Sequence, residues 1–328
     1  MQNEIHKHLG HNQVAIPIGI SACILGHEVR YNGGHKLDRF IRDTLGAYVR
    51  FVPVCPEVEI GLGTPRETLR LEKDDNMVRL VTTKSKLDHT KSMELFAKKQ
   101  TEQLADENLC GYILQKGSPS CGMERVRIYS KPGVAPNRNG QGLFAKALMQ
   151  YFPNLPVEED GRLNDPGLRE NFIERIFAYR RLRNLFNKAW KTGDLVAFHT
   201  REKLLLLAHD RLSYGELGRL VASSKDQDRL DVACRYETLF MAGLRKKATR
   251  AKQTNVLQHI AGHFKKRIEP DDRQELSEVI MSYRAGYVPL VVPITLLRHY
   301  VRHHGVTYLA NQTYLDPHPS ELMLRNHV

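Results

Sequence analysis

The first half of the chain alternates short apolar runs with stretches of helical spacing. The apolar runs Val14–Ile20, Val49–Val54 and Tyr112–Leu114 have the length and composition of buried strands. Apolar residues spaced three and four apart predict helices over Leu37–Tyr48 and Leu87–Asn108. Strands that alternate with helices are typical of an α/β fold. We therefore expect a Rossmann-like, mostly parallel sheet with helices on both faces.

Shorter elements complete this half. Thr68–Leu71 and Met77–Val81 have the pattern of a β-hairpin, and Val126–Tyr129 has that of another short strand. The prolines and glycines of Lys131–Gly142 predict a loop, which leads into a helix over Leu143–Tyr151.

Turn residues dominate 157–167, and we expect the strands to stop there. Asp165 followed by Pro166 is typical of a helix cap and the first helical position. After this point, apolar residues recur at helical spacing. The predicted helices are Leu168–Thr192, Asp194–Asp210, Tyr214–Ser223, Gln227–Lys247, Thr249–Phe264, Pro270–Ala285 and Pro293–His304. The predicted organisation is a polar tail over 1–13, an α/β domain over 14–160 and an all-helical domain over 168–328.

Positive charge is concentrated in the second half. Residues 1–160 hold 21 Lys and Arg against 19 Asp and Glu, whereas the rest of the chain holds 28 against 18. A basic domain joined to a nearly neutral one indicates a polyanionic partner such as a nucleic acid; the alternative is a solvated basic surface. The candidate nucleic-acid contacts are Arg180, Arg181, Arg183, Lys203, Arg245, Lys246, Lys247, Lys265, Lys266 and Arg267.

Three cysteines occupy turns that follow predicted strands, namely Cys23, Cys55 and Cys121. The carboxyl ends of parallel strands meet at one edge of a sheet, where ligands bind. Thiolates suit zinc or an iron–sulfur cluster better than magnesium or calcium. The chain lacks the C-x-x-C pair common in structural zinc sites, whereas a cubane cluster accepts cysteines from distant loops. The trio therefore indicates either a metal centre or three buried structural cysteines.

Polar residues beside these turns are candidates for chemistry. Glu57 follows Pro56, where a carboxylate is favoured by the helix dipole or could act as a general base. Pro119 and Gly122 shape a loop that exposes a thiol and two serines, Ser118 and Ser120. The cations Arg30, Arg66 and Lys116 flank the turns, either to orient an anionic or carbonyl-bearing substrate or as ordinary loop charges.

Other features have less specific patterns. Cys110 precedes a strand and Cys234 lies within a predicted helix, so we expect both to be small buried residues. Gly140–Gly142, before a helix, resembles part of a phosphate-binding turn. Residues 1–12 lack the basic start and apolar core of a secretory signal, and no 18-residue apolar stretch is present, so we expect a cytoplasmic protein without a membrane span.

Together these motifs resemble known families. Ser21-Ala-Cys23-Ile-Leu-Gly with Arg30-Tyr31, Cys55-Pro-Glu57 with Pro65-Arg66, and Lys116 with Ser118-Pro-Ser120-Cys121-Gly122 resemble the bacterial thiouracil desulfidases over about residues 16–157. Phe177–Arg181, Val196–Lys203, Tyr214–Arg219 and Asn311–Pro319 resemble the YbgA-type helical domain. The two domains fused in one chain resemble the tRNA 4-thiouridine desulfidases.

The resemblance implies a [4Fe–4S] cluster held by Cys23, Cys55 and Cys121, whose fourth iron takes the thiocarbonyl sulfur. It implies that Glu57 and one serine of the Ser118/Ser120 pair help water to displace that sulfur as sulfide, without an external electron donor. The basic domain is then expected to grip thiolated tRNA. Two alternatives remain: a desulfidase of free thiouracil or thionucleotides, and a non-catalytic cluster-bearing protein that binds or senses RNA.

Overall fold

The structure is a computed structural model that describes residues 15–74, 77–130 and 134–328. The predicted tail over 1–13 lies outside the described residues. The chain divides into two compact units, Met1–Asn164 and Asp165–Val328, and this division falls between the two predicted domains. In the described ranges, none of the helices combines the length and apolar character needed to cross a membrane.

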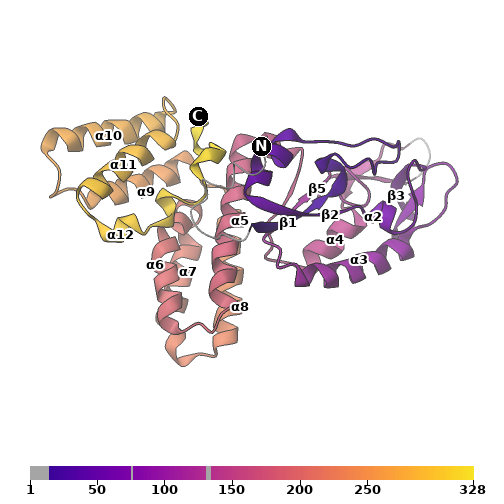
Figure 1. The fold of residues 1–328 in the computed structure, drawn as a ribbon, viewed down its shortest axis with the longest axis horizontal. Helices are drawn as coiled ribbons and strands as arrows, with labels where there is room; N and C mark the ends of the chain where they lie inside the picture. The colour runs from indigo at the N-terminus through magenta and orange to yellow at the C-terminus, as the bar shows by residue number, and fades with distance from the viewer. Residues whose placement is uncertain (1–14, 75–76, 131–133) are drawn as a thin grey trace. The chain divides into compact units, whose positions relative to one another are not determined.

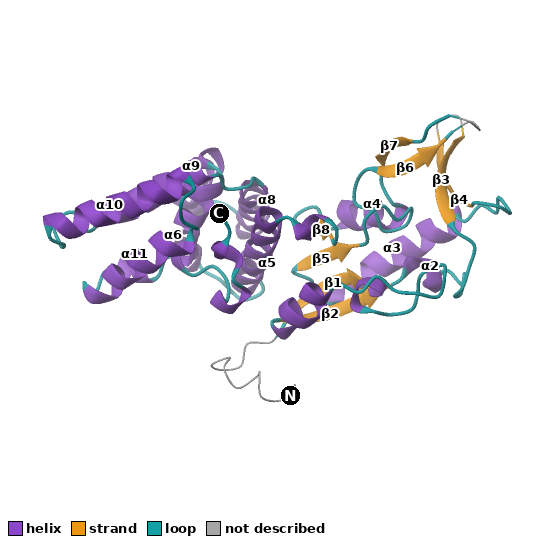
Figure 2. Ribbon diagram, turned by 90° about the horizontal axis from the view of Figure 1, so that it is seen from above, coloured by secondary structure: helices purple, strands orange, loops and turns teal. Residues whose placement is uncertain are grey.

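A parallel sheet forms the centre of the first unit (Figure 2). Its strands, in spatial order, are β2 (Val49–Val54), β1 (Ile16–Ser21), β5 (Gly111–Leu114) and β8 (Val157–Glu159). All three strand pairings are parallel. Every residue of β1 and β5 is buried, which explains why the sequence shows them as continuous apolar runs. The predicted α/β class with a parallel sheet is confirmed.

Two helices of the first unit, α3 (Thr90–Asp106) and α4 (Leu143–Tyr151), pack side by side along this sheet (Figures 1 and 2). The ring of Tyr112, from β5, lies 6.0 Å from the ring of Phe144, from α4. Gly19 on the neighbouring strand makes room for Tyr112, since a Cβ there would lie 2.2 Å from the ring. The sheet and its helices therefore form one closely packed core.

The predicted hairpin forms, but it belongs to a second sheet. The spatial order is β4 (Met77–Thr82), β3 (Leu69–Asp74), β6 (Val126–Tyr129) and β7 (Asn137–Gly140). β3 pairs antiparallel with β4 and parallel with β6, and β6 pairs antiparallel with β7. Leu71 and Leu80 face each other across the hairpin and are fully buried. A separate small core thus explains why these strands do not extend the parallel sheet.

Two segments predicted to lack strands contain them. β7 lies inside the expected loop over 131–142, and β8 lies at the start of the expected turn region. β8 reads as polar because it contains Glu158 and Glu159, yet both are buried. Glu158 accepts a hydrogen bond from Arg162 at 2.6 Å, and Glu159 accepts one from the backbone N–H of Met123 at 2.8 Å. These partners let the carboxylates occupy a buried edge strand.

Short helical turns complete the first unit. They are η1 (Ala22–Leu25), the π-turn η2 (Phe40–Thr44), η3 (Leu45–Ala47), α2 (Pro56–Glu59) and η4 (Arg162–Asn164). The helix predicted over 37–48 is therefore wrong in type and length. Its apolar spacing is satisfied by Ile41 and Leu45, which are fully buried from two short turns.

The second unit is helical, as predicted. Its helices are α5 (Pro166–Phe186), α6 (Thr192–His209), α7 (Arg211–Ala222), α8 (Arg229–Arg245), α9 (Arg250–Gly262), α10 (Pro270–Ala285), α11 (Val291–His303) and α12 (Thr307–Ala310), with short 3-10 turns η5 (Ser224–Asp226), η6 (Thr313–Leu315), η7 (Ser320–Leu322) and η8 (Leu324–Asn326). Asp165 caps α5 by accepting from the backbone N–H of Leu168 at 2.8 Å, and Pro166 takes the first helical position.

These helices pack in two groups (Figure 1). α5 to α8 contact one another, α9 to α11 form a second group, and α6 contacts α9. Aromatic rings fill the first group: the ring of Phe198 lies 6.0 Å from that of Tyr236 and 5.6 Å from that of Phe240. All three are buried, so this core is closed by side chains of α6 and α8.

Candidate active site

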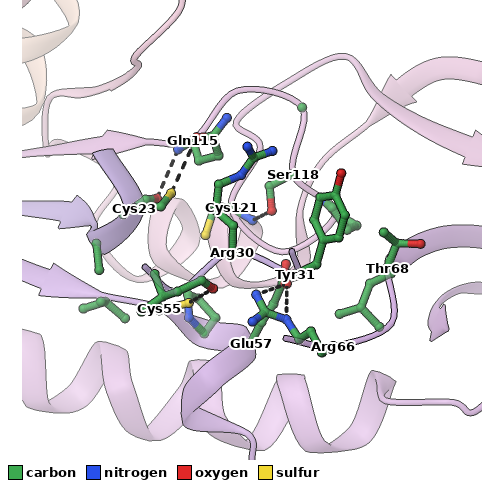
Figure 3. A pocket seen from close by; sticks show the side chains of 18 of the residues that line it. Cys23, Arg30, Tyr31, Cys55, Glu57, Arg66, Thr68, Gln115, Ser118 and Cys121 are labelled. Atoms are coloured by element: carbon green, nitrogen blue, oxygen red, sulfur yellow. Dashed lines mark hydrogen bonds and ion pairs between the residues drawn. The ribbon is translucent and has the colours of Figure 1, made fainter. Parts of the chain in front are cut away.

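The loops that follow β1, β2 and β5 bring their cysteines to one cavity (Figure 3). Cys23 lies in η1 directly after β1, and Cys55 follows β2 as the N-cap of α2. Cys121 lies farther along the loop after β5. All three line the same cavity, whose volume is about 230 Å³. The structure therefore places the three predicted thiols together at the carboxyl edge of the parallel sheet.

The three thiols lie in an environment that disfavours their ionisation. Cys23 and Cys121 are buried, and Cys55 is half-buried. Burial, with a further contribution from Cys55, raises the pKa of Cys23 to about 11. Burial also raises the pKa of Cys55 and that of Cys121. Thiolates would therefore form here only beside a strongly positive partner, which a bound metal centre supplies.

The donor set suits an iron–sulfur cluster, because three cysteines from three separate loops line one cavity. Their existing contacts are weak: the thiol of Cys23 lies 3.6 Å from Oε1 of Gln115, and that of Cys55 lies 3.7 Å from the carbonyl of Val29. Little would be lost if they ligated a cluster.

Glu57 is held rigidly beside the thiols. Arg66 donates from Nε and Nη2 to Oε2 of Glu57, at 3.0 and 2.6 Å. Ser120 donates from Oγ to Oε1 of Glu57 at 2.9 Å. The guanidinium is itself fixed by a 2.8 Å bond from Nη1 to the carbonyl of Gly63. The carboxylate thus has a defined orientation, and Arg66 positions Glu57 rather than pointing freely into the cavity.

The two candidate serines have different surroundings. Ser118 lines the cavity, and its Oγ accepts from the backbone N–H groups of Ser120 and Cys121 at 3.2 and 3.1 Å. Ser120 is fully buried and is bonded to Glu57. Ser118 is therefore the serine that a cavity-bound molecule can contact, while Ser120 supports Glu57 from behind.

The predicted cations Arg30 and Lys116 both line the cavity. The guanidinium carbon of Arg30 lies 5.6 Å from the ring centroid of Tyr31, which keeps the charge over an aromatic face. The backbone N–H of Lys116 donates to Oδ1 of Asp160 at 2.8 Å. Asp160 also pairs with Lys36 at 3.0 Å. The loop carrying Lys116 is thus anchored to the end of β8.

Several residues that line the cavity were not among the predicted site residues, and Tyr31, Thr68 and Gln115 are three of them. Gln115 directly follows the buried strand β5, and that position was the available signal for it. Its backbone N–H donates to Oγ of Ser21 at 3.1 Å, which ties the ends of β5 and β1 together. Thr68 directly precedes β3 of the second sheet. The sequence does not predict where that sheet lies, and therefore does not predict that Thr68 lines the cavity.

The glycines resembling a phosphate-binding turn serve another purpose. A Cβ on Gly142 would lie 2.5 Å from the backbone of Ser120. The first N–H groups of α4 are occupied by this loop, because Leu143 donates to the carbonyl of Pro119 and Ala145 to that of Ser120, both at 3.2 Å. The interpretation as a phosphate cradle is therefore wrong: Gly142 lets the helix N-terminus support the cysteine loop.

The remaining cysteines lie outside the cavity. Cys110 is fully buried at the start of β5, as expected. Cys234 is exposed on α8, so the prediction that it is buried is wrong. Helical spacing in α8 places Val232 and Tyr236 in the core, and Cys234, which lies between them, faces outward.

The basic residues of the second unit differ in their availability. Arg181 donates to both carboxylate oxygens of Glu202, at 2.6 and 3.0 Å, and is therefore committed to an internal pair. Six other predicted nucleic-acid contacts are at least partly exposed; two of them pair with a carboxylate and one lies against an aromatic ring. Lys246 pairs with Asp210 at 2.8 Å, Lys247 lies 3.7 Å from Asp165, Lys203 lies 5.0 Å from the ring centroid of Tyr308, and Lys265, Lys266 and Arg267 are exposed after α9.

Comparison with known proteins accounts for both units. Residues 18–160 match the model of the 2-thiouracil desulfurase family, and residues 203–319 match a family of unknown function, DUF1722. The uncharacterized protein YbgA of Escherichia coli strain K12 is 34% identical over 158 residues, which are 48% of this chain and 94% of that protein. The uncharacterized protein YbbK of Bacillus subtilis strain 168 is 31% identical over 151 residues, 44% of this chain and 97% of that protein.

A solved structure, a [4Fe-4S]-dependent thiouracil desulfidase named TudS, is 31% identical over 46% of this chain and 94% of its own, with a TM-score of 0.39. The family match assigns the first unit, with its parallel sheet and three-cysteine cavity, to the desulfurase class. The chain belongs to the 2-thiouracil desulfurase family through its first unit, fused to a DUF1722, YbgA-like helical region.

Proposed function

We propose that the chain is a [4Fe–4S]-dependent desulfidase that converts 4-thiouridine in tRNA to uridine. The observation that carries this proposal is a cavity in which three desolvated thiols and one rigidly held carboxylate meet. The overall reaction consumes water: the carbon–sulfur bond breaks, a carbon–oxygen bond forms, and sulfur leaves as hydrogen sulfide. Oxidation states do not change, so no electron donor is required.

Cys23, Cys55 and Cys121 would hold the cluster, which supplies a Lewis-acidic iron for the thiocarbonyl sulfur when it is bound. Three ligands leave one iron without a protein thiol. The raised pKa values of the free thiols support this assignment, because burial outweighs the positive charge that Arg30 brings to Cys23 and Arg66 to Cys55, so deprotonation calls for a further positive group.

Glu57 would accept the proton of the attacking water. Each carboxylate oxygen has further acceptor capacity beyond the bonds from Arg66 and Ser120, so Oε1 can also accept from a water in the cavity. Because both oxygens are anchored, the carboxylate does not need to reorganise when the proton moves. Ser118, which lines the cavity, would donate a hydrogen bond from its hydroxyl to a carbonyl oxygen or a ring nitrogen of the substrate.

The cavity, of about 230 Å³, is far too small for a folded nucleic acid, so only a single base of one could enter it. A thiobase in tRNA would therefore have to leave its stack, as in other enzymes that modify bases. The excess of basic residues in the second unit would hold the phosphate backbone while the base is extruded.

Free thiouracil is the second candidate substrate. The family model that matches residues 18–160 is named for 2-thiouracil, and the cavity would admit the free base. This alternative leaves the charge of the second unit without a purpose. Rates on free thiouracil, the 4-thiouridine nucleoside and thiolated tRNA separate the two substrates.

The test uses the full chain, reconstituted anaerobically with iron and sulfide. Loss of the near-ultraviolet absorbance of thiouridine and release of sulfide are followed together. We expect kcat/KM on tRNA to exceed that on the free base and to fall with added salt. Equal or higher rates on the free base would overturn the tRNA assignment. Tight tRNA binding without sulfide release would instead indicate a non-catalytic sensor.

A further inference from the structure

A cavity of the second unit, with a volume of about 760 Å³, is lined by three segments that lie far apart in the sequence. They are 181–190, at the end of α5 and in the turn that follows it, 194–201 of α6, and 308–312, in α12 and just after it. A cavity of this size is typical of small-molecule sites. The chemical step proposed above involves none of its residues.

One aromatic ring of this cavity is available to a ligand. Trp190 is half-buried and has one ring neighbour in the part of the chain that the structure describes, Phe186 at 5.3 Å. The other lining ring, that of Tyr308, already lies 5.0 Å from Nζ of Lys203 and 5.4 Å from the ring of His263. An indole that keeps part of its surface exposed is a platform on which a planar group can stack.

The charges of the lining leave an excess of positive charge. Lys188 and Arg201 are exposed, and neither side chain has an ion pair or a hydrogen bond to another described residue. Arg181 is compensated by Glu202, and Asp194 accepts from the backbone N–H group at the N-cap of α6 at 2.7 Å. Two uncompensated cations thus remain against one carboxylate, which favours a ligand that carries anionic groups.

Gln312 brings an acceptor without a donor to the same cavity. Its side chain is buried, and Nε2 donates to the carbonyls of Thr200 at 2.8 Å and Tyr308 at 3.4 Å. Because both partners are carbonyls, the amide nitrogen must face them, which leaves Oε1 without a partner among the described residues. Buried acceptors are rarely left unpaired. A phosphodiester offers no donor for this oxygen, whereas bases and ribose hydroxyls do.

Two further amides, those of Asn184 and Asn311, also line the cavity, and both residues are exposed. A primary amide donates and accepts at once, which matches the neighbouring donors and acceptors on the edge of a base. An aromatic platform, amides and uncompensated cations in one cavity are the chemistry that recognises an unstacked base together with its phosphates.

We propose that this cavity binds one unpaired nucleotide of an RNA strand. The base stacks on Trp190 and forms hydrogen bonds with Asn184 and Asn311. Lys188, in the turn after α5, and Arg201, on α6, offer separate cations to successive phosphates, which favours a strand over a free nucleotide. The choice of RNA rests on the proposed function, to which the cavity adds a site for a nucleotide other than the thiolated one.

The chain contains a single tryptophan, so its tryptophan fluorescence reports on this cavity alone. The test titrates the full chain with a tRNA transcript that has no thiolated base, a short single-stranded RNA, the same strand without its bases, the duplex of the same sequence, and uridine 5′-monophosphate. We expect the tRNA and the single strand to quench the fluorescence, and the abasic strand and the duplex to leave it unchanged.

Three results would overturn the proposal. They are no binding of the tRNA or the single strand, binding of either without quenching, and an affinity for the mononucleotide equal to that for the strand. Because the transcript has no sulfur to remove, none of these results depends on desulfurisation. Quenching by tRNA without sulfide release from thiolated tRNA would remove the desulfidase assignment and leave this site standing; sulfide release with unchanged fluorescence would do the reverse.

Variants separate stacking from phosphate contacts, with the binding of a labelled single strand as the measurement. Trp190→Ala should weaken binding about tenfold, the loss of one stacked base, without changing the dependence on salt. Trp190→Phe, which keeps a ring, should restore most of the affinity. Arg201→Gln and Lys188→Gln should each weaken binding severalfold and lower the slope of log affinity against log salt by about 0.7.

Arg302→Gln is the matched control, because Arg302 is exposed on α11 and does not line the cavity. It should change the affinity by less than about twofold. Wild-type affinity in Trp190→Ala would refute the stacking, and an unchanged salt slope in both Arg201→Gln and Lys188→Gln would refute the phosphate contacts. Thermal unfolding of each variant shows that a loss of binding is not a loss of folding.

Discussion

The thiol cavity of the first unit and the buried ion-pair network of the second unit treat their ionisable groups in opposite ways. In the first, the thiols of Cys23 and Cys121 are buried, and burial raises their pKa despite the charge that Arg30 brings to Cys23. In the second, Glu174 is equally buried but is compensated by Arg325 and His209. The difference teaches where each site obtains compensating charge: the proposed cluster would supply it to the thiol cavity, whereas the second unit's own side chains supply it to Glu174.

This comparison predicts two different kinds of failure. Removing a thiol removes a ligand but leaves no buried charge behind, so the first unit should lose its chemistry and keep its fold. Removing one partner of a buried ion pair leaves the other charge buried and uncompensated. This loss of unfolding free energy is much larger than the net stability that the intact pair contributes. Removing one partner of a buried ion pair in the second unit should therefore lower the free energy of unfolding more than removing a thiol from the first unit does.

The largest expected effect is that of the cysteines. Cys23→Ala, Cys55→Ala and Cys121→Ala should each abolish iron binding, the brown colour after anaerobic reconstitution, and sulfide release, because a cluster held by two thiols is lost. Visible absorbance and iron content measure the cluster, and circular dichroism measures the fold. Cys234→Ala, on an exposed position of α8, is the control and should keep colour and activity. A coloured, active Cys55→Ala protein would remove the cluster assignment.

The next largest effect separates the role of the cluster from that of the general base, Glu57. Glu57→Gln should keep the cluster but lower kcat by about 10²–10⁴-fold, the range for a lost general base. Glu59→Gln is the matched control, because Glu59 lies in the same short helix but is exposed and does not line the cavity. Single-turnover rates on thiouracil measure both variants. Wild-type rates in Glu57→Gln would assign the proton transfer to another group.

The positions of the three thiols could be predicted because buried parallel strands have a clear sequence pattern. Continuous apolar runs mark β1 and β5, and β2 is apolar except for the exposed Arg50. Parallel strands end at one edge of the sheet, so the cysteines that follow β1 and β2 are expected at that edge. The helices of the second unit were predictable for a similar reason, since their apolar spacing and the Asp165–Pro166 cap are local signals.

What escaped prediction depends on contacts distant in sequence. The acidic sequence of β8 resembles a turn, yet it forms a buried strand because Arg162 pairs with Glu158 and the N–H of Met123 donates to Glu159. No local pattern in the sequence reveals these two contacts. The division of labour between Ser118 and Ser120 was invisible for the same reason: only the folded loop places one hydroxyl in the cavity and the other on Glu57.

The buried network of the second unit gives the third prediction. Arg325→Met should leave Glu174 uncompensated on one side and destabilise the chain by about 3–5 kcal/mol. Denaturant unfolding measures the free energy, and Arg284→Met, which removes an exposed charge from α10, is the control. Under conditions where the variant stays folded, its rate on free thiouracil should match the wild type. A loss of less than 1 kcal/mol would mean that His209 alone compensates Glu174.

The smallest predicted effect concerns Asp210, which caps α7 and pairs with Lys246 at 2.8 Å. Although burial opposes it, hydrogen bonds from Lys246 and Ser213 lower the pKa of Asp210 from 3.8 to about 2. A lowered pKa stabilises the folded state at pH values above the unfolded pKa, and this contribution disappears as pH falls through the folded pKa. Lys246 is half exposed and water screens the pair, so Asp210→Asn should cost only about 1 kcal/mol at pH 7.

Asparagine is also a good helix cap, so the substitution isolates the charge of Asp210 from its capping role. The difference in unfolding free energy between wild type and Asp210→Asn should therefore narrow as pH falls from 3.8 toward 2. The control is Asp231→Asn, which breaks an exposed pair with Arg235 and should change stability by no more than a few tenths of a kcal/mol. A difference that stays constant over this pH range would show that the aspartate acts through its cap and not through its charge, which would weaken the view that the second unit is stabilised by charges it compensates internally.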